Sequence, residues 1–131
     1  MKAMARTLSV VTLIMLVAIG HEACGFKRKL VSITIIPDNV TLGSPGLSVQ
    51  FKAVGNYIHP PDSHDITNSV KWESAAPQVV SIDQTGLATA GDACGTNITI
   101  TATSFSDPEN NSGSLVIGQA TVNVTCAGAI E

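Results

Sequence analysis

The densest group of side chains that could do chemistry lies in one short stretch of the 131-residue chain, His59-Pro60-Pro61-Asp62-Ser63-His64-Asp65. Two imidazoles and two carboxylates in this stretch could together bind a divalent cation, namely those of His59, Asp62, His64 and Asp65. No fixed ligand spacing such as HExxH is present, and two prolines stiffen the stretch. We therefore interpret it as a solvated loop and keep metal binding at these four residues as the alternative.

The rest of the chain has no catalytic pattern. Ser63 directly precedes His64, and adjacent residues alone cannot bring a hydroxyl and a ring nitrogen into nucleophile geometry. The sequence holds no CxxC pair and no glycine-rich phosphate loop. Its net charge of −3 and its few aromatic residues give little for a nucleic acid to bind. We expect no enzymatic activity, no cofactor, no nucleic-acid partner, and we identify no small-molecule substrate.

Three cysteines are the remaining candidates for covalent chemistry. Cys24 follows an apolar run, at the place where a bacterial lipoprotein signal ends in a cysteine that becomes lipidated. That pattern asks for a Leu-like residue three places earlier, then a small residue, then Gly or Ala. The chain has His21, Glu22 and Ala23 at these places, so only the last of them fits.

The beginning of the chain predicts export. Lys2 and Arg6 give it a positive start, and an apolar run from Leu8 to Ile19 follows. This run is too short to cross a bilayer core of roughly 30 Å as a helix, but it suits a signal peptide. We therefore predict a signal peptide over residues 1–23 and a location in the cell envelope.

Two outcomes of export stay open. If Cys24 is lipidated, residues 24–29 form a tether, the membrane is a partner, and the basic run 27–29 lies against the anionic membrane surface or is simply solvated. If ordinary cleavage occurs after Gly20 or after Gly25 instead, the protein is secreted or periplasmic. Lipidation leaves the other two cysteines as an even pair in an oxidising compartment, which favours it.

The elements that must position these residues are β-strands. Thr, Val and Ile are frequent after the apolar run, and such branched side chains suit a pleated sheet. Seven segments read as short strands: 30–36, 47–57, 70–74, 79–82, 87–89, 97–104 and 115–126. Apolar and polar residues alternate with a period of two in all of them except 79–82 and 87–89. Residues 59–69 and 105–114 are the polar loops between them. The pattern predicts one all-β domain over 30–131, either a sandwich or a barrel.

The last two predicted strands allow a sharper inference. If they pair antiparallel about a loop near Asn110, one register brings their apolar residues face to face. Its pairs are Ile98 with Val122 and Ile100 with Ala120. The same register puts Cys94 opposite Cys126 on one face, where the Cβ atoms lie close to disulfide range. We predict a Cys94–Cys126 disulfide.

The strongest pattern in the chain is Val70-Lys71-Trp72-Glu73-Ser74, followed by Thr85-Gly86-Leu87-Ala88-Thr89-Ala90 and by Gly95-Thr96-Asn97-Ile98-Thr99-Ile100-Thr101-Ala102. It resembles the bacterial immunoglobulin-like domain of group 2, which occurs in intimin- and invasin-like surface proteins. The resemblance covers nearly all of Leu30 to Val124 and implies an immunoglobulin-like Greek-key β-sandwich of about seven strands. With the strand alternation it places a common core at Trp72, Phe51, Ile98, Ile100 and Val122.

The resemblance also implies a function class. We expect a non-catalytic module of the cell envelope, with a structural role or an envelope or surface protein as partner. An adhesin or carbohydrate-binding domain is one alternative, and it would need an exposed aromatic platform, for which Tyr57, Phe26 and Phe105 are available. A metal site on the loop at His59 to Asp65 is the other.

Overall fold

The computed structural model describes residue 25 and residues 27–43 and 46–126. The predicted signal peptide, Cys24 and Phe26 lie outside the described residues. Ten β-strands and no α-helix occur within the described part of the chain. In that part, no helix has the length and apolar character needed to cross a membrane.

The strands alternate with short turns along the chain. Their bounds are β1 (Lys29–Ile36), β2 (Asn39–Gly43), β3 (Ser48–Gln50), β4 (Lys52–Ile58), β5 (Asp62–Asp65), β6 (Lys71–Ser74), β7 (Val80–Ile82), β8 (Leu87–Ala90), β9 (Gly95–Asp107) and β10 (Ser112–Thr125).

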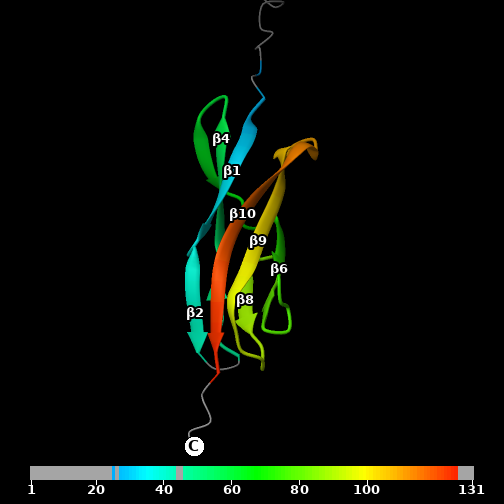
Figure 1. Cartoon of the computed structure of the whole chain (residues 1–131). Coiled ribbons are helices and arrows are strands. Elements are labelled where there is room, and N and C mark those ends of the chain that lie inside the picture. The colour runs from blue at the N-terminus through cyan, green and yellow to red at the C-terminus, as the bar shows by residue number, and fades with distance from the viewer. Residues whose placement is uncertain (1–24, 26, 44–45, 127–131) are drawn as a thin grey trace, which may run out of the picture.

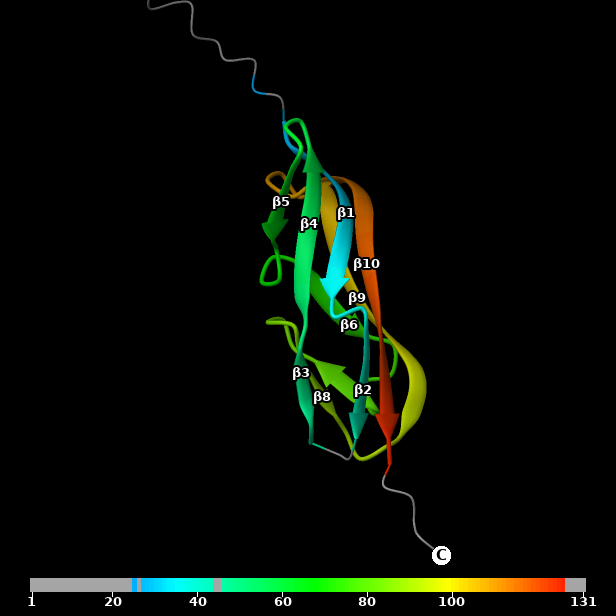
Figure 2. The same ribbon diagram turned by 90° about the vertical axis from the view of Figure 1, so that its left-hand side faces the viewer.

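Two layers of sheet face each other, as expected for the immunoglobulin-like sandwich (Figures 1 and 2). One layer is the sheet β2-β10-β9-β6. The other consists of the sheets β1-β4-β5 and β3-β8-β7, which are joined because β3 runs into β4 with only Phe51 between them. β1 pairs with β4, whereas β2 pairs in parallel with β10, so the first part of the chain contributes to both layers.

The core lies between the layers and contains most of the side chains predicted for it. Trp72 is 2% exposed, Phe51 is fully buried, and their ring centroids are 6.4 Å apart. Ile100 and Val122 are also fully buried. Ile98 is only partly buried and packs at the margin of this cluster, so its predicted place inside the core is corrected to the edge.

The predicted register of the last two strands is confirmed. Ile98 pairs with Val122 and Ile100 with Ala120 in the β9–β10 ladder. Beyond Val122 the register shifts by one residue at a bulge. Cys94 and Cys126 still meet there, with their Cα atoms 5.3 Å apart, and form the predicted disulfide.

Four parts of the strand prediction were wrong. Residues 59–69 contain β5, which pairs with β4 through backbone groups although all its side chains are exposed. β9 and β10 extend into the predicted loop 105–114 and leave only the short turn 108–111. The predicted strand 47–57 divides into β3 and β4, and β2 was missed, because the chain changes sheet at Phe51 and after Pro37.

The domain is elongated and its two ends differ (Figure 1). At one end lie the beginning of β1, the β4–β5 turn and the β9–β10 turn, and we call this end the N-terminal pole. At the other end lie the last residues of β2 and β10, followed by the disulfide, and we call it the C-terminal pole. The chain therefore enters the domain at one end and leaves it at the other.

Candidate functional site

A polar hollow of about 580 Å³ lies where the chain passes from β3 to β4. We call it the crossover groove. Its lining combines hydroxyl, amide and charged side chains with one stretch of backbone: Gln50, Phe51, Lys52, Asp65, Thr67, Asn68, Ser69 and Thr85. Such a group of polar side chains is the first place to look for chemistry in this molecule.

The backbone around Phe51 needs hydrogen-bond partners because the strand leaves one sheet and joins another there. The Phe51 N–H donates to the carbonyl of Gly86 over 2.8 Å, and the Ala53 N–H donates to Thr67 Oγ1 over 3.0 Å. Gly86 has a φ of +81°, and a Cβ at this position would lie 2.7 Å from the Phe51 carbonyl oxygen. The close approach at this crossing thus requires glycine.

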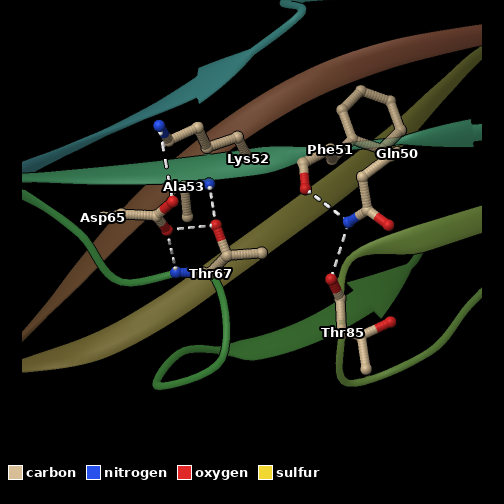
Figure 3. Close-up of polar contacts among 7 residues, drawn as sticks. All are labelled: Gln50, Phe51, Lys52, Ala53, Asp65, Thr67 and Thr85. Carbon is tan, nitrogen blue, oxygen red and sulfur yellow. Dashed lines mark hydrogen bonds and ion pairs between the residues drawn. The ribbon is translucent and has the colours of Figure 1, made fainter.

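Thr67 and Asp65, which both line the groove, form one hydrogen-bonded unit (Figure 3). Asp65 Oδ1 accepts from the Thr67 hydroxyl over 2.6 Å and from the Thr67 N–H over 3.0 Å. Lys52 Nζ lies 3.4 Å from Asp65 Oδ2. The Thr67 hydroxyl, followed by its backbone N–H, lowers the pKa of the Asp65 carboxyl below its ordinary value. Asp65 is therefore held as a carboxylate that positions Thr67.

Two glutamine side chains perform a similar task. Gln50 Nε2 donates to the Phe51 carbonyl over 2.9 Å and to the Thr85 carbonyl over 2.7 Å. Gln84 uses both ends of its amide on β6, accepting from the Trp72 N–H over 3.4 Å and donating to the Trp72 carbonyl over 3.2 Å. Each amide makes hydrogen bonds to backbone groups at a place where no neighbouring strand pairs with them.

The Gln50, Asp65 and Thr67 side chains of the crossover groove are thus occupied in holding the fold. The Thr67 hydroxyl is buried, and both of its hydrogen bonds, to the Asp65 carboxylate and from the Ala53 N–H, stay within the domain. We find here the geometry of a strand crossing and no arrangement of nucleophile, base and oxyanion donors.

The four residues of the predicted metal alternative do not converge. β5 pairs with β4 as a regular strand, so the side chains of Asp62 and His64 point to one face and that of Asp65 to the other. His59 lies outside β5, in the turn before it, with a φ of 62°. Among the described residues, no three His, Cys, Asp or Glu side chains are grouped closely enough to bind one metal ion.

Part of this stretch instead meets the segment before β1, at the N-terminal pole. Arg28 Nη1 is 2.8 Å from His64 Nε2, and its Cζ lies 5.2 Å from the centre of the Tyr57 ring. The His64 ring meets the Tyr57 ring edge-on at 5.8 Å, and Asp62 Oδ2 is 2.8 Å from His64 Nε2. We call these four residues the Arg28 cluster.

The Arg28 cluster bears on two expectations. Arg28 is exposed and contacts the domain itself, and its place against the membrane stays a prediction. Tyr57 was considered for a sugar-binding platform, but Arg28 lies over its ring and His64 lies against it. Phe105, the other described candidate, is 36% exposed and stands opposite Leu115 on the outer face of β9 and β10.

Sequence reasoning missed Thr67, Gln84 and the role of Arg28. A repeated pattern could have revealed the first of these, because Asp65-Ile66-Thr67 and Asp83-Gln84-Thr85 share the spacing Asp-x-Thr. In both, the carboxylate accepts from the threonine hydroxyl over 2.6 Å and from its N–H. Asp and Thr commonly close turns in this way.

Comparison with known proteins agrees with this architecture. Residues 30–110 match the family model described as bacterial Ig-like domain (group 2). A stretch of 92 residues, 70% of the chain, is 40% identical to Ice-binding protein 1 of Shewanella frigidimarina (strain NCIMB 400). The chain spans only 10% of the length of that protein.

Proposed function

The chain belongs to the bacterial Ig-like domain (group 2) family, and from this premise we propose that it is a non-catalytic cell-envelope module, lipid-anchored through Cys24. Family membership supports a place at the cell surface. The positive start and the apolar run before Cys24 support export and anchoring. The arrangement of the domain supports a structural or protein-interaction role.

The observation that carries this proposal is the placement of the two poles. β1 begins at the N-terminal pole and β10 ends at the C-terminal pole, along the long axis of the domain (Figure 1). In a module with this geometry, the chain before the domain and the chain after it leave from opposite ends. The groove chemistry is consistent with such a role, because its polar groups serve the strand crossing.

A protein is the partner class that we favour. The outer face of β9 and β10 exposes Leu115 by 59% and Ile117 by 55%, next to Phe105. Exposed apolar side chains that stand together are typical of protein contacts. The aromatic platform that a carbohydrate would need is weakly supported, because Arg28 covers the Tyr57 ring.

The named relative suggests ice binding as a second candidate. The outer face of β9 presents Thr99, Thr101 and Thr103 in one row. On β10, Thr121 lies opposite Thr99, but Gln119 lies opposite Thr101 and Ile117 opposite Thr103, so threonine continues across the sheet at only one of the three positions. Because the chain spans a tenth of that relative, we place the structural role first.

Two measurements test these functions. For anchoring, we expect labelled fatty acid to be incorporated into the full chain at Cys24 and to be lost in Cys24→Ser, while Ala23→Gly, which keeps a small residue before the cysteine, retains the label. Unchanged processing and unchanged membrane association of Cys24→Ser would contradict the anchor.

For ice binding, thermal hysteresis that disappears in Thr101→Lys would establish the second candidate, and we expect no hysteresis.

A further inference from the structure

One ring nitrogen of His64 lies between a cation and an anion. Its Nε2 is 2.8 Å from Arg28 Nη1 and also 2.8 Å from Asp62 Oδ2. An imidazole nitrogen has either one lone pair or one N–H in the plane of its ring. Nε2 can therefore accept a hydrogen bond from Arg28 or donate one to Asp62, but no single protonation state allows both.

The groups that face His64 come from three elements. Arg28 lies just before β1, Tyr57 is on β4, and Asp62 is on the same strand as His64. Glu109, in the β9–β10 turn, lines a hollow of about 250 Å³ together with Arg28 and Tyr57. The groups in contact with His64 are thus one guanidinium, one phenol ring and one carboxylate, with Glu109 near Arg28 and Tyr57, and the His64 side chain is 45% exposed to the solvent that supplies protons.

We propose that His64 is a proton-dependent latch for the segment that precedes β1. In the neutral state, the Nε2 lone pair accepts from Arg28, whose guanidinium also rests on the Tyr57 ring. Histidine side chains gain a proton from solvent within about pH 8 to 5. The imidazolium then donates to Asp62, repels the guanidinium, and Arg28 leaves.

The consequence of the latch is a change in how the segment before β1 is held. With Arg28 bound, residues 27–28 are fastened to β4 and β5. With Arg28 released, this fastening is lost. This inference goes beyond the proposed function, because it concerns a contact within the chain and is the same whether or not Cys24 carries a lipid.

Nuclear magnetic resonance of the full chain, kept in a zwitterionic detergent, measures the latch directly. The nuclear Overhauser effect between the Arg28 side chain and the Tyr57 ring reports the docked state, and the His64 ring carbon shift reports protonation. We expect the Overhauser effect to fall several-fold in step with the protonation that the His64 ring carbon shift reports. The Trp72 indole N–H, bonded to the Thr67 carbonyl over 2.8 Å, reports that the domain stays folded.

Variants assign the effect to named groups. His64→Gln keeps a neutral acceptor for Arg28 and removes the proton, so we expect Arg28 to stay docked throughout the pH range. Asp62→Asn removes the negative charge that stabilises the imidazolium, so release should need a lower pH. His59→Gln removes the histidine of the adjacent turn: an unchanged release curve supports the assignment to His64, and loss of the release would overturn it.

Three results would overturn the latch. The Overhauser effect could stay constant while the His64 ring titrates, or it could be absent at every pH. It could also fall with pH in His64→Gln as it does in the unmodified chain, which would assign the release to another group. None of these results depends on acylation of Cys24, so a failure of the latch and a failure of the anchor are distinguishable.

Discussion

The crossover groove and the Arg28 cluster are both rich in polar side chains, but they use them differently. In the groove, the Thr67 and Gln50 side chains bond to backbone groups that a strand crossing would leave without partners. In the Arg28 cluster, side chains bond mainly to one another on the surface, and the fold around them is complete without these contacts. Polar density therefore does not identify a functional site by itself. The question that separates the two regions is whether the fold already requires each polar group.

The largest expected effect lies under the groove, at Trp72. Replacing Trp72 by Ala empties the middle of the core and removes the donor to the Thr67 carbonyl. We expect a loss of about 3–5 kcal/mol in the free energy of unfolding, measured by urea titration. Trp72→Phe should lose less, because it keeps most of the ring volume. An equal loss in both variants would mean that the hydrogen bond matters more than the packing.

Thr67→Val tests whether the groove serves the fold. Valine keeps the shape of threonine but leaves the Ala53 N–H without its acceptor, so we expect a loss of about 1–3 kcal/mol by urea titration. Thr67→Ser keeps the hydroxyl and is the matched control. If Thr67→Val were as stable as the unmodified chain, the groove would resemble the Arg28 cluster, and its polar groups would be free for another role.

Acid should affect the groove through its carboxylates. The pKa values of Asp65 and Asp83 are lowered in the fold, each mainly by a threonine hydroxyl. A lowered pKa stabilises the fold above the unfolded value of 3.8, and this stabilisation disappears as pH falls through the folded value. We expect the urea midpoint to be steady from neutral pH to about pH 5 and then to fall.

The matched variants for this acid response are Asp65→Asn and Asp92→Asn. Asp65→Asn should flatten the decline below about pH 4, because one of the responsible carboxyls has been removed. Asp92 is exposed and makes none of the groove contacts, so Asp92→Asn should keep the full decline. A decline of the same steepness in both variants would remove Asp65 from the explanation.

The smallest effect should come from Arg28→Gln. Arg28 is exposed, and exposed polar contacts contribute little to stability, so we expect a change of no more than about 0.5 kcal/mol in the unfolding free energy. A loss as large as that of Thr67→Val would show that the N-terminal pole is part of the folding unit. Urea titration of both variants side by side makes the comparison.

Much of the scaffold could be predicted from local pattern. Strict alternation in 97–104 and 115–126 gave both the register and the disulfide, because a one-residue slip would have turned every apolar side chain outward. β5 could not be found in this way, since an exposed edge strand pairs through its backbone and needs no apolar alternation. β2 was missed for a different reason: the chain changes partner sheet directly after Pro37.

The candidate sites were less predictable than the strands. The seven-residue stretch from His59 to Asp65 suggested a cation site, but strand alternation separates its side chains. Its actual partner, Arg28, is 36 residues away from His64 in the sequence and belongs to a different element. Local spacing carries no information on such a contact, which arises because β1 and β5 flank β4 in one sheet.

The position of the two poles determines how the domain responds to mechanical force. β2 and β10 run in parallel through five paired positions, from Asn39 with Thr121 to Gly43 with Thr125. If the two ends of the chain are pulled apart, these strands are drawn in opposite directions, and the whole ladder is loaded in shear at once. The Cys94–Cys126 bond passes part of the load from the end of β10 to the start of β9. Rupture under tension would then require several hydrogen bonds to break together, which slows forced unfolding.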